Sequence, residues 1–155
     1  MVIKMYLNKK EIHRKYKIMS FEACDRYCKQ SHKNSSVIIS ITSFPNMPKV
    51  HKTKKNNVQD ILYLEFCDLT AEDDVDNCMQ WEDADKIVEF VNKWYGKVDT
   101  IIVHCDGGVS RSAGVCAAIM RVKEGDDWPV FDSSSKHPNM TCYHRVLTKF
   151  NYDAS

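Results

Sequence analysis

The segment that decides the fold spans residues 100–122 and reads TIIVHCDGGVSRSAGVCAAIMRV. Its first four residues are all β-branched, which predicts a buried strand over residues 100–103 in the centre of a sheet. Residues 112–122 are small or apolar on almost every side, which predicts a buried helix. The loop between them therefore joins the carboxyl end of a strand to the amino end of a helix, where open α/β sheets bind their ligands.

The loop is suited to holding an anion. Two glycines let its backbone curl, and a curled loop turns successive N–H groups inward to form a nest for negative charge. The following helix adds the positive end of its dipole, and the guanidinium of Arg111 matches two oxygens of a phosphate. We therefore expect a phosphate to be bound by Asp106, Gly107, Gly108, Val109, Ser110 and Arg111.

Cys105 stands at the mouth of this nest. The field that attracts a phosphate also stabilises a thiolate, so we expect a low pKa for Cys105 and a nucleophilic sulfur that needs no neighbouring base. Ser112 is placed to hydrogen-bond that sulfur and to favour its departure later in a reaction. His104 is expected to support the loop from behind rather than to act as a base.

Residues 104–112, the signature segment, fit the pattern His-Cys-x5-Arg-Ser/Thr, and Gly108 fits its fuller form with a central glycine. This segment resembles the signature of the cysteine-dependent protein tyrosine phosphatases. The short chain, the late position of the signature and the helix before its strand resemble the compact dual-specificity-type branch, over roughly residues 16–150. The resemblance implies catalysis through a phosphocysteine, with no metal and no cofactor.

The resemblance also implies a general acid, which in this branch is an aspartate on the loop that follows the preceding strand. Asp68 closes the expected strand over residues 61–66 and is our first choice. Asp73 and Asp74 are the alternatives, because the whole loop from Cys67 to about Met79 is acidic and a solvated loop would have the same composition.

The rest of the chain alternates between strand and helix patterns. This order predicts one α/β domain over residues 1–155, with a mainly parallel central sheet and helices on both faces, as in the dual-specificity phosphatases. The expected elements are a strand-like entry at 16–19, a helix capped by Ser20 and ending near Ser31, strands at 37–41 and 61–66, a helix at 80–95 and a last helix capped by Asn139. Residues 42–60 and 125–138 are expected to be loops.

The composition indicates which cellular compartment and which kinds of site to expect. The 155 residues include no apolar run of membrane-spanning length, and the amino-terminal sequence does not resemble a signal peptide. The seven cysteines are odd in number, and Cys24 and Cys28 have no partner motif for zinc, so we expect reduced thiols, no metal site and a cytoplasmic location.

Basic and acidic residues are concentrated in different parts of the chain, although the net charge is only +1. Residues 1–55 hold 13 Lys/Arg against 3 Asp/Glu, and residues 56–106 hold 3 against 13. Solvated faces and steering of a charged ligand both account for such sorting. The lysines of the long loop are expected to attract a phosphorylated partner if this loop borders the site: Lys49, Lys52, Lys54 and Lys55.

The predicted function is hydrolysis of phosphomonoesters, with a phosphorylated protein or peptide as the substrate. Asp106 would repel extra phosphates, which favours a phosphoprotein over a phosphoinositide or an RNA 5′-phosphate. Preference for phosphotyrosine over phosphoserine is left open. The alternatives are a non-catalytic module that binds phosphate or phosphopeptide on the same fold and, less favoured, a nucleic-acid-binding protein.

Overall fold

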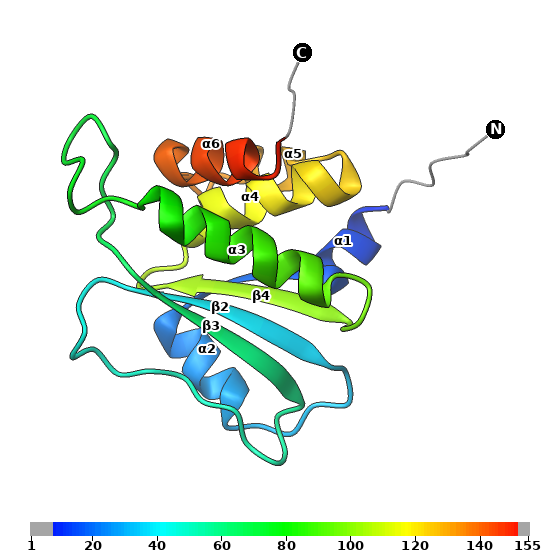
Figure 1. Cartoon of the computed structure of the whole chain (residues 1–155). Helices are drawn as coiled ribbons and strands as arrows, with labels where there is room; N and C mark the ends of the chain where they lie inside the picture. Colours follow the sequence, from blue (N-terminus) through cyan, green and yellow to red (C-terminus); the bar gives the residue numbers. More distant parts are fainter. Residues whose placement is uncertain (1–7, 152–155) are drawn as a thin grey trace.

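The computed structural model describes residues 8–151 and contains a four-stranded sheet. The strands are β1 (Tyr16–Ser20), β2 (Ser36–Thr42), β3 (Val58–Glu65) and β4 (Thr100–Cys105), in the spatial order β1-β4-β2-β3 (Figure 1). All three pairings are parallel. The carboxyl ends of the strands therefore meet at one edge of the sheet, where β4 delivers Cys105.

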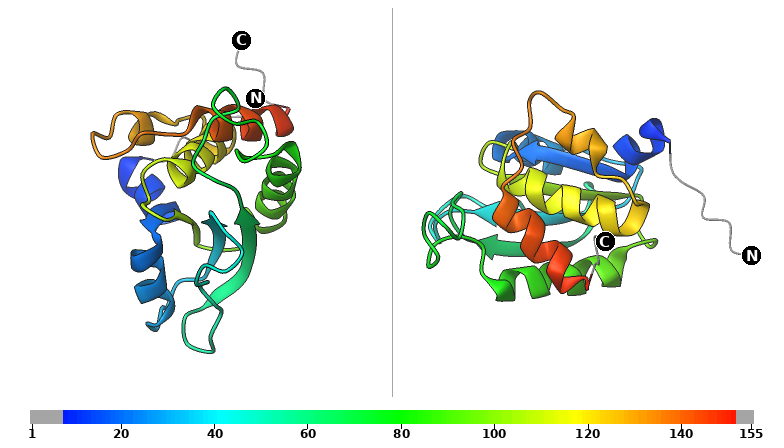
Figure 2. Two further views of the ribbon diagram at one scale, coloured as in Figure 1. Left: turned by 90° about the vertical axis from the view of Figure 1, so that its left-hand side faces the viewer. Right: turned by 90° about the horizontal axis from the view of Figure 1, so that it is seen from above.

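Helices cover both faces of the sheet, as the sequence predicts. Helices α3 (Trp81–Trp94), α4 (Arg111–Glu124) and α6 (Met140–Lys149) lie on one face, and α2 (Phe21–Cys28) lies on the other (Figures 1 and 2). The side chain of Ser20 accepts a hydrogen bond from the amide of Ala23, and that of Asn139 accepts one from Cys142. Both expected amino-terminal caps are thus confirmed.

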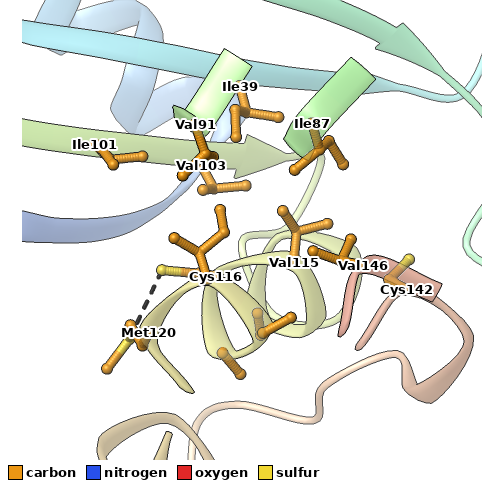
Figure 3. Packing of buried hydrophobic residues seen from close by; sticks show 14 of the residues in the cluster. Ile39, Ile87, Val91, Ile101, Val103, Val115, Cys116, Met120, Cys142 and Val146 are labelled. Carbon is orange, nitrogen blue, oxygen red and sulfur yellow. Dashed lines mark hydrogen bonds between the residues drawn. The ribbon is translucent and has the colours of Figure 1, made fainter. Parts of the chain in front are cut away.

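The main core lies between the sheet and the three-helix face. Figure 3 shows Val103 of β4 and Ile39 of β2 facing Val115 of α4, with Val146 of α6 beside them. Helix α4 is buried over most of its length, because it is covered by the sheet on one side and by α6 on another. A smaller cluster around Ile38 and Ile102 lies under α2.

Two helices were not expected from the sequence. Helix α1 (Lys9–Lys15) is polar and has little apolar periodicity, but Asn8 and Glu11 form a reciprocal capping box that satisfies its first amides. Helix α5 (Trp128–Phe131) is a short turn with a proline at its start, inside the segment 125–138 expected to be a loop. Among residues 8–151, no helix is long and apolar enough to cross a membrane.

Candidate functional site

The signature segment forms a tight loop between β4 and α4 at the carboxyl edge of the sheet. Gly108 adopts φ +68°, and a Cβ atom there would overlap the backbone of Met19 and Ser20. Only glycine is tolerated at this position. A Cβ at Gly107 would meet only the side chain of Val109 at 3.9 Å. The curled conformation of the loop therefore requires a glycine at position 108 and not at position 107.

Cys105 lies at the base of this loop and is almost fully buried. Its Sγ atom is 3.0 Å from Oγ of Ser112. Burial by itself favours the neutral thiol, but the hydroxyl and amide of Ser112, the amide of Gly108 and the charge of Arg111 hold the pKa of Cys105 below its ordinary value. The sequence-based expectation of a low pKa therefore agrees with the surroundings of the sulfur.

Arg111 is buried and held by three acceptors from other segments. Its Nη1 donates to the carbonyl of Phe66 at 2.7 Å and to Oγ of Ser43 at 2.9 Å, and its Nη2 donates to Oδ2 of Asp106 at 3.1 Å. Its buried Nε has no hydrogen-bond partner among residues 8–151. A buried charged donor left unpaired is costly, so this atom indicates a place for an acceptor such as a phosphate oxygen.

Asp106 contributes more than a backbone amide. Its carboxylate pairs with Arg111 and accepts a second hydrogen bond from Oγ of Ser43 at 3.2 Å. Ser43 could not be predicted as a partner of this carboxylate, since it follows β2 and is 63 residues from Asp106 along the chain. Ser43 and Asp106 come together because β2 and β4 are parallel neighbours, so the carboxyl ends of the two strands lie side by side.

Asp68 lies against the signature segment, as expected for the first-choice acid. Its Oδ1 accepts hydrogen bonds from Oγ of Ser110 at 2.8 Å and from Nδ2 of Asn139 at 3.0 Å. The same Nδ2 also donates to the carbonyl of Leu69, and the amide of Asn139 donates to the carbonyl of Ser110. Asn139 therefore joins the acidic loop (residues 67–79) to the signature segment.

The role of Asn139 was missed because a helix cap accounts for its residue type. Its backbone approaches α4 closely at Gly114, where a Cβ atom would overlap the carbonyl of Asn139. A small residue in α4 is thus what lets Asn139 reach Asp68.

The alternative acids are engaged in local turns. Asp73 accepts a hydrogen bond from the amide of Thr70. Asp74 binds the side chain of Asn77, and this contact holds the pKa of Asp74 below its ordinary value. A carboxyl that is harder to protonate is poorly suited to donate a proton, which leaves Asp68 as the candidate that contacts the signature segment.

His104 is fully buried behind the loop. Its Nε2 is 2.6 Å from Oγ of Ser40, and its Nδ1 is 3.2 Å from the carbonyl of Cys105. Burial lowers the pKa of His104, so the ring is neutral near pH 7. These contacts match the expected supporting role.

The lysines of the long connection lie at different points along β3, with the amine of Lys49 5.3 Å from the centre of the Tyr63 ring. The connection begins at Ser43, beside Arg111, but it returns to the opposite edge of the sheet, where Asn57 accepts from the amide of Ser36. Lys52 donates to the carbonyl of Gln59, near the start of β3. Steering of a phosphorylated partner by these lysines therefore stays a prediction, since the loop only begins beside the site and its later part lies along β3.

We expect Asn139→Ala to lower kcat for an aryl phosphate by about tenfold, the scale of one lost hydrogen bond to a charged group. The substitution removes one of the two side-chain donors to Asp68 and leaves Ser110 and the residues around Cys105 in place. Steady-state assays with a thermal melt as the folding control measure the effect. An unchanged kcat in a folded variant would show that Asn139 does not position the acid.

Among the described residues 8–151, no three His, Cys, Asp or Glu side chains are grouped as metal ligands. All seven cysteines are free, including Cys24 and Cys28 on α2.

Comparison with solved structures places the fold. The chain is similar to human DUSP28 (TM-score 0.58, 16% identity, covering 90% of this chain and 94% of that one). It is also similar to the Cydia pomonella PTP-2 phosphatase (TM-score 0.58, 18% identity, covering 94% of this chain and 90% of that one). A third similar structure is PTPMT1 in complex with PI(5)P (TM-score 0.56, 17% identity, covering 90% of this chain and 92% of that one). The sequence matches no protein-family model and no curated protein.

These likenesses extend over nine-tenths of the chain or more. The chain therefore has the fold of the compact, dual-specificity-type branch of the cysteine-dependent protein tyrosine phosphatase superfamily.

Proposed function

We propose that this protein hydrolyses phosphomonoesters through a phosphocysteine formed on Cys105. One observation carries the proposal: a cysteine with a lowered pKa lies in an anion-binding loop beside a buried arginine whose Nε lacks a partner. This combination provides a nucleophile and a receptor for the group it attacks.

The first step joins Cys105 to phosphorus. The thiolate forms an S–P bond as the P–O bond to the leaving group breaks, and Asp68 gives its proton to the departing oxygen. Arg111 and the loop amides hold the remaining phosphoryl oxygens. In the second step Asp68 accepts a proton from water as the water attacks phosphorus, and the sulfur leaves as a thiolate stabilised by Ser112.

A non-catalytic phosphate-binding module is the competing function. The same loop would hold phosphate without turning it over, but such a module has no need for a thiolate stabilised by Ser112. The test is hydrolysis of an aryl phosphate with a metal chelator present. Turnover that vanadate blocks is expected; binding of phosphate with no turnover would overturn the proposal in favour of the module.

Asp68→Asn is expected to lower kcat for an alkyl phosphate by about 10²–10³-fold, within the usual range for general acid catalysis. An amide cannot donate the proton, so the fall of rate toward high pH should disappear from the remaining activity. The pH–rate profile of the variant measures this. A profile like that of the wild type would move the role to Asp73 or Asp74.

We propose a phosphorylated protein or peptide as the substrate. The carboxylate of Asp106 is 43% exposed and lies 3.1 Å from Arg111, so it adds negative charge beside the phosphate position. A ligand with several phosphates would be repelled more than a simple monoester. The bound PI(5)P belongs to PTPMT1, and a lipid substrate is the alternative for this chain.

A reactive thiolate also suits a reducing compartment, so we propose a cytoplasmic location.

Asp106→Asn is expected to keep the hydrogen bond to Arg111 and remove the charge. We expect KM for an inositol polyphosphate to fall about fivefold more than KM for a phosphotyrosine peptide, since one charge at close range in water contributes about 1 kcal/mol. Parallel steady-state assays on both substrates measure the ratio. Equal changes would show that Asp106 does not select against multiply charged ligands.

A further inference from the structure

A groove of about 350 Å³ runs beside β1. Strand β1 pairs with β4 on one side, and within residues 8–151 no strand pairs with its other side. Four consecutive residues of the strand, 16–19, line the groove. Side chains of a strand alternate between the two faces of a sheet, so consecutive residues share a groove only along the strand's edge. The groove therefore borders an unpaired main chain.

The other walls of the groove are mainly apolar. Ile12 of α1, Met120 of α4, and Pro129 and Val130 of α5 line it. Figure 2 shows the segment around α5 passing over β1, which agrees with this lining. An apolar wall facing a strand edge is the surface that receives alternate side chains of an added strand.

The charged groups of the groove are both cationic. Lys17 and Lys136 line it, and none of its lining residues is acidic. Lys136 donates one hydrogen bond to the carbonyl of Gly108 at 2.6 Å, so two of its three N–H donors remain for another acceptor. The amine of Lys17 lies 5.6 Å from the centre of the Tyr27 ring. Charge complementarity thus favours an acidic occupant.

We propose that this groove binds an extended, acidic segment of a partner protein, which adds to the sheet as a strand beside β1. An unpaired strand edge offers main-chain donors and acceptors that a polypeptide matches along its whole length. Apolar side chains of the segment would meet Ile18 and Pro129, two partly exposed apolar residues of the lining, and its carboxylates would meet the two lysines. None of the lining residues belongs to the signature segment or to the acidic loop, so the inference does not depend on phosphatase activity.

The experiment uses a fluorescent, end-capped hexapeptide of alternating valine and glutamate, with polarisation as the readout. Two matched probes accompany it: the same peptide N-methylated at every residue, which has no main-chain N–H donors, and an alternating valine–lysine peptide. We expect the first peptide to bind at least tenfold more tightly than either matched probe. Equal binding of the N-methylated peptide would overturn strand addition, and equal binding of the lysine peptide would overturn the acidic preference.

Protein variants locate the site. Lys17→Glu is expected to weaken binding of the valine–glutamate peptide about threefold or more, the scale of an exposed charge pair. Lys33→Glu is the matched control, since Lys33 is exposed and does not line the groove. Equal weakening by both variants would overturn the location. A dimer in sedimentation that the peptide dissociates would assign the groove to a second copy of the chain, and so also overturn the proposal.

Discussion

Cys105→Ser is expected to abolish hydrolysis of an aryl phosphate, with a loss of at least about 10⁴-fold in kcat, as for removal of other covalent nucleophiles. A serine hydroxyl has a far higher pKa than a thiol, and the contacts that stabilise a thiolate do not ionise it. Vanadate binding should persist, because Arg111 and the loop amides remain. The measurement is release of the aryl alcohol together with a binding isotherm for vanadate.

Cys67→Ser is the matched control, since Cys67 is half-buried and lies outside the signature segment. Activity that survives in Cys105→Ser would contradict the assignment, and the control is expected to keep the activity of the wild type. The pKa of Cys105 gives a second measurement. Because the folded protein lowers this pKa, the thiolate persists at pH values below those of an ordinary cysteine, and the rate of alkylation by iodoacetamide should reach its plateau at correspondingly lower pH.

Arg111→Lys is expected to lower kcat/KM by about 10³-fold, the second largest effect after that of Cys105→Ser. A lysine carries one compact charge and cannot make the contacts to Phe66 and Asp106 while also presenting a fork of donors to phosphate. Loss of donors that act in the transition state lowers kcat as well as affinity, by about 3–4 kcal/mol for an important donor. Steady-state kinetics separate the two effects.

Arg145→Lys serves as its control. Arg145 also donates to a main-chain carbonyl, that of Met79, but it lies on α6 and outside the proposed site. The control should retain activity and the melting temperature of Arg111→Lys should stay near that of the wild type. Full activity in Arg111→Lys would show that the guanidinium does not hold the transferred group.

Local signals in the sequence predict much of this molecule. The segment over residues 100–122 combines a β-branched strand, a glycine-containing loop and a buried helix, and each is a pattern of neighbouring residues. Ser20 and Asn139 are N-cap residues and predict in the same local way where their helices begin. Asp68 could be chosen because parallel strands bring their carboxyl ends to one edge.

The contacts that hold the site in place could not be predicted, since they join residues far apart in the chain. Ser43 and the carbonyl of Phe66 reach Arg111 only through the pairing of β2 with its neighbours. Nothing in the sequence of a polar loop says along which part of the sheet it runs, so the sequence could give the role of its lysines only as conditional on the loop's position. Helix α1 was missed because its capping box acts without an apolar stripe.

The position of Asn139 has a consequence for the order in which activity arises during synthesis. The signature segment and the acidic loop leave the ribosome first, and Ser110 supplies one donor to Asp68, yet the second donor, Asn139, arrives only with the last helix. A nascent chain that ends before residue 139 carries the proposed nucleophile and the anion-binding loop without this second anchor of the proposed acid. Helix α6 also supplies Cys142, Tyr143, Val146 and Leu147 to the main core, so we expect full turnover to begin only when α6 docks against α4.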